Sequence, residues 1–245
     1  MKQKLLSWIL VAMLALGACC PLMFHRAGEA QTVFSPARCP EQTLILDAGH
    51  GGEDGGAVSL SGVAESGINL DIVLRMEQIL GLYGIAPVLL RREDVSLHDS
   101  SAQTLREKKV SDLHNRVSEV ESYAQATLVS IHQNTFPQAQ YHGAQVFYAN
   151  EDLSLSFAQL TQDILRKSLD PENSRQPKPI PDTVYLMNHI TCPAILVECG
   201  FLSNPEEDLL LQSEAYQVKL ASALTAAWIQ YQTAGEGAPI TEEEA

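Results

Sequence analysis

The sequence predicts a single α/β domain: a twisted, mostly parallel or mixed sheet with helices on both faces, preceded by an N-terminal hydrophobic segment. Short apolar runs alternate with longer stretches in which apolar residues recur at helical spacing. The chain has 245 residues and 45% of them are hydrophobic. That is enough for one core in a domain of roughly 200 residues. No internal repeat interrupts the alternation.

The N-terminal segment 5–24 carries no charged side chain and follows Lys2 and Lys4. A helix of roughly 20 residues can cross the hydrocarbon core of a bilayer, and flanking lysines keep its start in the cytoplasm. Residues 1–24 are therefore predicted to be a membrane anchor or signal segment. Three outcomes stay open: an uncleaved anchor, which we favour, cleavage by signal peptidase, and lipidation at Cys19. Each places the domain outside the cytoplasmic membrane.

Residues 25–42 are polar, lack any period and contain two prolines, so they are predicted to be a linker. The folded domain is predicted over 43–232. Residues 233–245 include three consecutive glutamates and are predicted to be an acidic C-terminal tail.

The first half of the domain is predicted to alternate strand and helix. A short apolar strand covers 44–46, and the helix after it has an apolar residue at every third or fourth position until Gly84 ends it. The next strand is predicted at 86–90. A longer helix follows, and its predicted buried face is formed by Leu113, Val117, Val120 and Ala124.

The second half is predicted from the same signals, with four prolines between 171 and 181 marking a long loop. The predicted strands are 128–131, 145–148 and 194–197. The predicted helices are 153–169, 206–211 and 216–231.

Charge and cysteine content narrow the class of protein. The formal net charge is −14 and the sequence pI is near 4.8. This argues against nucleic acid as a partner, because phosphate binding needs basic stripes. The five cysteines include no CxxC pair, so a structural zinc–cysteine cluster is not expected. A bridge between Cys39 and Cys192 stays open.

Four side chains suited to metal binding and proton transfer lie at strand ends and at a helix start. His50 follows the first strand in a glycine-rich turn, and Glu65 begins the next helix. His132 follows the strand 128–131, and Glu198 follows the last strand. Ligands bind at strand ends in α/β sheets. Two imidazoles and one carboxylate are what an open catalytic zinc site needs, with the fourth position left to water.

Each of these residues also has an ordinary explanation. His50 could be a surface residue in a turn, and His132 could be a core histidine whose ring nitrogens are hydrogen-bonded. Glu65 could simply complement the helix dipole. A carboxylate that ends a buried strand is costly unless it is functional or paired. The candidate partners of Glu198 are Arg92 and Arg116.

Four motifs together resemble the zinc-dependent N-acetylmuramoyl-L-alanine amidases. They are residues 46–52 with 54–57, Glu65, residues 130–134 and residues 197–204. Their order and spacing fit from about Thr43 to Tyr231. The membrane-proximal segment, the lack of extra binding domains and the sequence Tyr185-Leu186-Met187 look closest to the sporulation-type amidase that acts on spore cortex.

The resemblance implies one zinc ion per chain, with His50, Glu65 and His132 as ligands and Glu198 as the catalytic glutamate. It implies hydrolysis of the amide that joins the lactyl group of N-acetylmuramic acid to L-alanine of the stem peptide. In sporulation-type relatives the stripped muramic acid feeds a deacetylase that makes muramic δ-lactam.

The sequence departs from the family pattern at three positions. Ala48 stands where proline is usual, Gln133 replaces a small or apolar residue, and Cys199 stands where valine or threonine is common. None of these removes a ligand. Gln133 lies between a ligand and the next motif residue, so it is expected to affect substrate contact or the hold on metal. Asp47 and Asn134 are candidates for orienting the imidazoles.

The implied partners are peptidoglycan glycan strands with their stem peptides, an accessory protein or lipoprotein, and the membrane through the N-terminal segment. The implied location is outside the cytoplasmic membrane, which for the sporulation type is the intermembrane space of the forming spore. Two other functions compete. One is a cysteine hydrolase that uses Cys199, and the other is a non-catalytic peptidoglycan-binding module with a decayed site.

Overall fold

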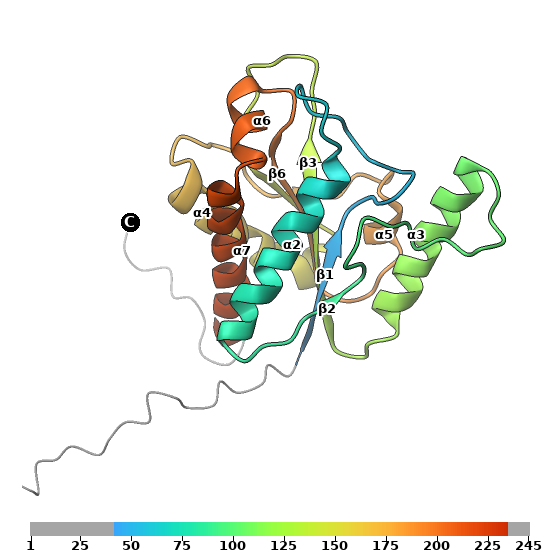
Figure 1. Cartoon of the computed structure of the whole chain (residues 1–245). Coiled ribbons are helices and arrows are strands. Elements are labelled where there is room, and N and C mark those ends of the chain that lie inside the picture. Colours follow the sequence, from blue (N-terminus) through green and yellow to red (C-terminus); the bar gives the residue numbers. More distant parts are fainter. Residues whose placement is uncertain (1–41, 235–245) are drawn as a thin grey trace, which may run out of the picture. The chain divides into compact units, whose positions relative to one another are not determined.

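The structure is a computed structural model, and it describes residues 42–234 (Figure 1). The predictions for the membrane segment, for the linker up to residue 41 and for the tail from residue 235 fall outside this range, as does Cys39. Among the described residues, no helix has both the length and the apolarity that crossing a membrane requires.

Six strands form one mixed sheet, in the order β2-β1-β3-β6-β4-β5. The predicted fold class is confirmed. Four neighbouring strands are parallel: β2 (Val88–Leu89), β1 (Thr43–Ala48), β3 (Ala126–Asn134) and β6 (Ala194–Phe201). The other two, β4 (Gln145–Tyr148) and β5 (Lys178–Pro179), are parallel to each other, and β4 is antiparallel to β6.

The central strands are nearly continuous apolar runs because both faces of the sheet are covered. Successive side chains of a strand point to opposite faces. In β1, Leu44 and Leu46 therefore join the larger hydrophobic core, whereas Ile45 joins the smaller core on the other face.

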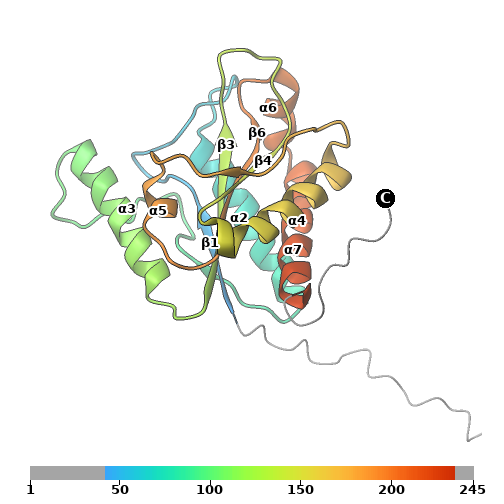
Figure 2. The same ribbon diagram turned by 180° about the vertical axis from the view of Figure 1, so that it is seen from behind.

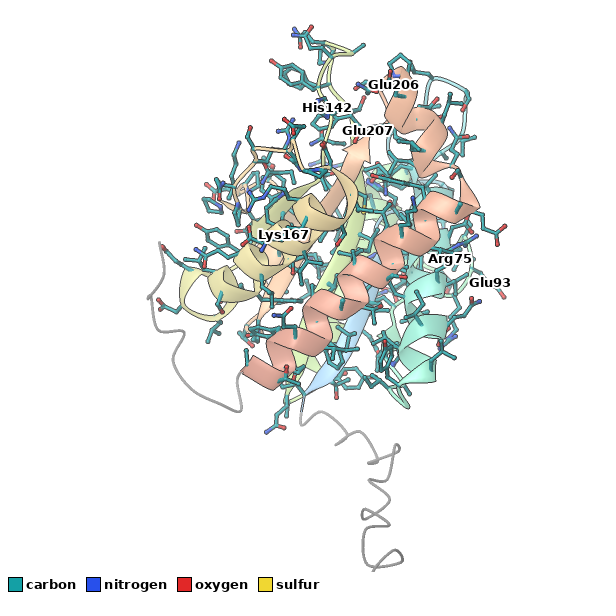
Figure 3. The ribbon with its side chains drawn as sticks, turned by 90° about the vertical axis from the view of Figure 1, so that its left-hand side faces the viewer. Arg75, Glu93, His142, Lys167, Glu206 and Glu207 are labelled. Atoms are coloured by element: carbon teal, nitrogen blue, oxygen red, sulfur yellow. The ribbon has the colours of Figure 1, made fainter. Side chains whose placement is uncertain are left out.

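The larger core lies under α2 (Glu65–Leu82), α4 (Glu151–Leu169) and α7 (Glu214–Ala234). Figure 3 shows α7 in front of the sheet, between α4 and α2. The opposite face carries α3 (Leu105–Glu121) and the short α5 (Tyr185–Asn188), as Figure 2 shows from behind. The remaining helix, α6 (Pro205–Leu211), packs against β6 and α7.

Both helices predicted in the first half are present, and α2 ends where Gly84 predicts. In α2 the buried residues recur at helical spacing, and Gly84, with φ of +73°, follows its end. In α3 a capping box fixes the start, because the Thr104 side chain accepts a hydrogen bond from the Glu107 N–H and the Glu107 side chain accepts one from the Thr104 N–H.

Several boundaries differ from the prediction. Ala124 lies beyond the end of α3 and not on its buried face. The strand predicted at 86–90 shortens to β2, since Pro87 has no N–H for the ladder. In contrast, β3 and β6 continue past their apolar runs to Asn134 and Phe201, because pairing between them persists through polar residues. The short β5 and α5 are not predicted from the sequence.

Candidate metal and catalytic site

Three of the four predicted residues come together at the carboxyl edge of the sheet. His50, Glu65 and His132 each offer one ligand atom, and these atoms lie within 4.8 Å of one another. The Glu65 carboxylate lies between the rings, with Oε1 3.0 Å from His132 Nδ1 and Oε2 3.5 Å from His50 Nε2. The centroids of the two imidazole rings are 5.0 Å apart.

Glycine makes this approach sterically allowed. A Cβ added at Gly49 would lie 2.2 Å from His132 Nε2, and one added at Gly56 would lie 2.6 Å from Glu65 Oε2. His50 itself has a φ of +62°, in the left-handed region that non-glycine residues seldom adopt. Backbone of this kind is found where the surrounding structure fixes it, often at functional sites.

The Glu65 carboxylate is held by several donors at the first turn of α2. Ala57 N–H donates to Oε2 at 2.9 Å, and Oε1 accepts from Gln133 N–H at 3.0 Å and from Asn69 Nδ2 at 3.2 Å. Burial opposes ionisation of Glu65, but the His132 contact, the nearby His50 and the Gln133 N–H lower its pKa to about 2. The side chain is therefore a carboxylate at neutral pH, as a metal ligand must be.

His50 has an orienting partner that the sequence reasoning missed. Its Nδ1 lies 3.0 Å from Asp54 Oδ2, while Nε2 faces Glu65. The hydrogen bond with His50 lowers the pKa of Asp54, and Lys109 Nζ is a further partner at 3.1 Å. A carboxylate on the second ring nitrogen is a common support for a metal-binding histidine. The available signal was the position of Asp54 four residues after His50.

Neither predicted orienting residue touches an imidazole through a hydrogen bond within residues 42–234. Asp47 instead forms a buried ion pair with Arg116 and accepts a hydrogen bond from Ser130 Oγ at 2.6 Å. Asn134 contributes its backbone carbonyl, which accepts from Leu202 N–H at 2.8 Å. Asp47 acts on the site only indirectly, because Arg116 also donates to the carbonyl of His50 at 2.7 Å.

Glu198 lies beside the cluster, directly opposite His132 in the β3–β6 register. Its Oε2 is buried and has no hydrogen-bond partner among the described residues. The ordinary explanation, pairing with an arginine, is wrong, since Arg92 pairs with Glu77 and Arg116 with Asp47. Burial, aided by the nearby Glu65 charge and opposed by the histidines, raises the pKa of Glu198 to about 7. A carboxyl of this kind can accept and return a proton near neutral pH.

Cys199 cannot serve as a nucleophile in this arrangement. It follows Glu198 on β6, so its side chain points to the opposite face and joins the larger core. The residue is fully buried, and burial raises the pKa of its thiol well above the usual range. The thiolate required of a cysteine hydrolase is therefore strongly disfavoured.

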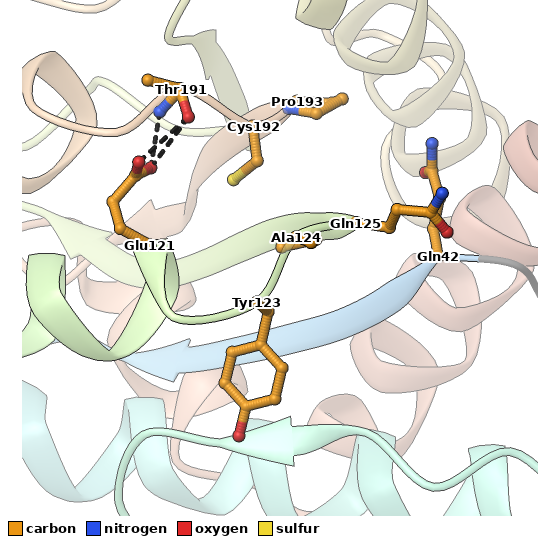
Figure 4. Close-up of a pocket in the computed structure, with 9 residues that line it drawn as sticks. Gln42, Glu121, Tyr123, Ala124, Gln125, Thr191, Cys192 and Pro193 are labelled. Carbon is orange, nitrogen blue, oxygen red and sulfur yellow. Dashed lines mark hydrogen bonds between the residues drawn. The ribbon is translucent and has the colours of Figure 1, made fainter.

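A separate hollow lies at the opposite, amino ends of the parallel strands (Figure 4). It is lined by residues that precede β1, β3 and β6, including Gln42, Gln125 and Cys192. On its rim the Thr191 N–H and hydroxyl donate to Glu121. Burial raises the pKa of Cys192 to about 11. No member of the histidine cluster lines this hollow.

The histidine–glutamate cluster fits a zinc ion by the chemistry of its donors. Two imidazoles and one carboxylate are the donor set of an open zinc site, and the glycines leave their inner side clear. An α/β sheet with a cluster positioned for metal binding at its carboxyl edge and a buried carboxyl beside it suits an amide hydrolase.

Comparison with known proteins makes this class specific. Residues 44–230 match the family model described as N-acetylmuramoyl-L-alanine amidase, and the chain belongs to this family. It is an enzyme that acts on the amide between N-acetylmuramic acid and L-alanine in peptidoglycan.

Similar proteins include the germination-specific N-acetylmuramoyl-L-alanine amidase of Bacillus subtilis. It is 35% identical over 191 residues, which are 78% of this chain and 79% of that protein. A solved structure of the CwlD amidase from Clostridioides difficile, in complex with the GerS lipoprotein, is 38% identical with a TM-score of 0.75. The match covers 79% of this chain and 99% of that one. A Clostridium difficile 630 amidase of the same activity is 26% identical with a TM-score of 0.69, over 81% of this chain and 100% of that one.

Proposed function

We propose that the protein binds one zinc ion per chain through His50, Glu65 and His132, with Glu198 as its catalytic base and acid. The convergence of the three donors within 4.8 Å carries this proposal. The unpartnered, buried oxygen of Glu198 supports the second part, because a functional carboxyl needs a free oxygen to meet the substrate.

Zinc at this position would supply Lewis-acid activation of water and of the scissile carbonyl. Glu198 then accepts one proton from the attacking water as the oxygen–carbon bond forms. It returns that proton to the nitrogen of the departing L-alanine as the carbon–nitrogen bond breaks. The products are a muramic acid carboxylate and a free stem peptide. Glu65 stays ionised throughout, held by its N–H donors.

We further propose that the substrate is spore-cortex peptidoglycan. The similarity to a germination-specific amidase and to CwlD supports this role. The stripped muramic acid would be consumed by a deacetylase that forms muramic δ-lactam. The domain would occupy 43–232 and act outside the cytoplasmic membrane, with 1–24 as anchor or signal, 25–42 as linker and 233–245 as tail. The complex of CwlD with a lipoprotein supports an accessory protein as a partner here.

Two substitutions separate metal binding from proton transfer. His132→Ala should lose bound zinc and activity together. Glu198→Gln should keep zinc and lower peptide release by about 10² or more, because a positioned general acid–base contributes about that much. The measurements are zinc content by atomic absorption and peptide released from purified glycan. Near-normal turnover in Glu198→Gln would remove this residue from the mechanism. A non-catalytic module predicts glycan binding with no release by the wild-type protein, with or without zinc.

A further inference from the structure

Gln133, one of the three positions that depart from the family pattern, lies at an irregularity next to the proposed metal ligands. The β3–β6 register runs from His132 opposite Glu198 to Asn134 opposite Phe201, so β6 uses one more residue than β3 in this interval. Irregular pairing of this kind frees backbone groups from the ladder and re-aims them, often beside active sites. Here the freed Gln133 N–H donates to Glu65 Oε1 at 3.0 Å.

The side chain of Gln133 makes a second link to Glu65, which runs through Asn69. Its Nε2 donates to Asn69 Oδ1 at 3.0 Å. Asn69 Nδ2 in turn donates to Glu65 Oε1 and to the carbonyl of Gly49, both at 3.2 Å. Gln133 is 3% exposed and Asn69 is fully buried, so water does not compete for these bonds. The hydrogen bond to Asn69 Oδ1 fixes which way the Asn69 amide faces.

We propose that Gln133 is a positioning residue that strengthens zinc binding through Asn69. Its amide holds Asn69 with the nitrogen turned toward Glu65 and toward the backbone that precedes His50. Two of the three ligands therefore depend on one buried amide pair. This inference rests on the proposed zinc site and concerns how firmly that site is held.

A purely structural role explains this glutamine poorly. Its Oε1 is buried with no hydrogen-bond partner among the described residues, which destabilises the folded state. Its side chain lies beside the buried Cys199 thiol, which is only a weak hydrogen-bonding group. An apolar side chain of similar length would suit that environment better. The presence of glutamine here is therefore explained by the hydrogen bond that its Nε2 donates to Asn69 Oδ1.

The test is the zinc affinity of Gln133→Met, measured on full-length protein by competition with a chromophoric chelator. Methionine keeps the length and removes the donor. We expect the zinc dissociation constant to rise about tenfold or more, as is typical when a residue supporting a metal ligand is lost. The midpoint of thermal unfolding of the zinc-free protein should stay equal or rise. Unchanged zinc affinity in this variant would overturn the proposal.

Two further variants make the test specific. Gln217→Met alters another buried glutamine, which donates to the Leu211 carbonyl. Both residues follow the proposed site residues in the sequence, and this variant should leave zinc affinity unchanged. Asn69→Ala should weaken zinc binding, and adding Gln133→Met to it should cause no further loss, because both act through one path. Additive losses would contradict the route through Asn69. A wild-type protein that binds no zinc would instead overturn the proposed function itself, and this inference with it.

Discussion

Among the single residues of the site, two glycines have the least room for substitution. Gly49 faces the His132 ring, and Gly56 faces both Glu65 and the His50 ring. Between them His50 adopts a left-handed backbone conformation that its turn imposes. A residue with a Cβ at either glycine would collide with a candidate ligand, so both glycines are part of the candidate metal site although neither has a ligand atom.

We therefore expect Gly49→Ala to abolish zinc binding and activity, since the new methyl group would lie 2.2 Å from His132 Nε2. Gly67→Ala is the matched control. Its Cβ would meet nothing within 4 Å, and alanine within α2 should stabilise the protein by about 0.5–1 kcal/mol. Zinc titration of both variants checks the expectation. Full zinc occupancy in Gly49→Ala would show that the ring can move aside.

At the scale of elements, α3 fixes the turn that carries His50, although it is distant from that turn in sequence. Arg116 of α3 is buried, donates to the carbonyls of Ala48 and His50, and pairs with Asp47 and with Asp112. Arg91, which follows β2, donates to the carbonyl of Gly49. Two buried guanidinium groups thus hold the backbone around the left-handed residue.

The ion pair between Asp47 and Arg116 should make the free energy of unfolding depend on pH in the acid range. Burial opposes ionisation of Asp47, but Arg116 and Ser130 lower its pKa below the ordinary value of 3.8. Ionised Asp47 therefore stabilises the fold at every pH above 3.8, and this contribution fades as pH falls through the lower folded-state pKa. Asp47→Asn should cost about 3 kcal/mol at pH 7. The difference from wild type should stay constant down to about pH 4 and then shrink.

Urea unfolding of the zinc-free proteins at several pH values measures this difference. Glu77→Gln is the control, because it breaks the solvent-exposed pair with Arg92 and should have little effect on stability. A gap between wild type and Asp47→Asn that widens toward low pH would contradict the assignment.

For the whole molecule, the sequence predicts the architecture well because the central strands are apolar on both faces and the helices are periodic. It also predicts that His50, Glu65, His132 and Glu198 lie together, since each follows an apolar run or begins a helix, and the structure brings them to one edge of the sheet. The ends of β3 and β6 are missed because polar residues continue the pairing there.

The supporting residues of the site could not be predicted in the same way. Asn69 has no signal in the sequence that sets it apart from other helix residues, and Arg116 is expected to pair with Glu198, until the fold brings them to the carboxyl edge of the sheet. Asp47 is a carboxylate at a strand end and so could orient a histidine, but its carboxylate pairs with Arg116 instead. Long-range partners of this kind have no local pattern in the sequence.

Metal binding should also stabilise the domain as a whole, because the ligands come from segments that unfolding separates. Free zinc at 1,000 times its dissociation constant adds about 4 kcal/mol to the free energy of unfolding. For a domain of this size that corresponds to roughly 10 °C in melting temperature. Scanning calorimetry before and after chelation, with zinc added back, measures it. His132→Ala should show no such shift, and an equal shift in that variant would place the stabilising ion elsewhere.

The three candidate ligands all precede the loop that leaves β3, whereas Glu198 follows it on β6. The proposed metal coordination and the proposed proton transfer are therefore encoded in different stretches of the gene. A lineage that replaced only Glu198 would keep a metal-loaded, correctly folded wall protein that has lost turnover. Such an inactive descendant would occupy the same sites on the glycan as its parent and compete with it. A single codon change would therefore turn a wall hydrolase into a protein that protects the wall from hydrolysis.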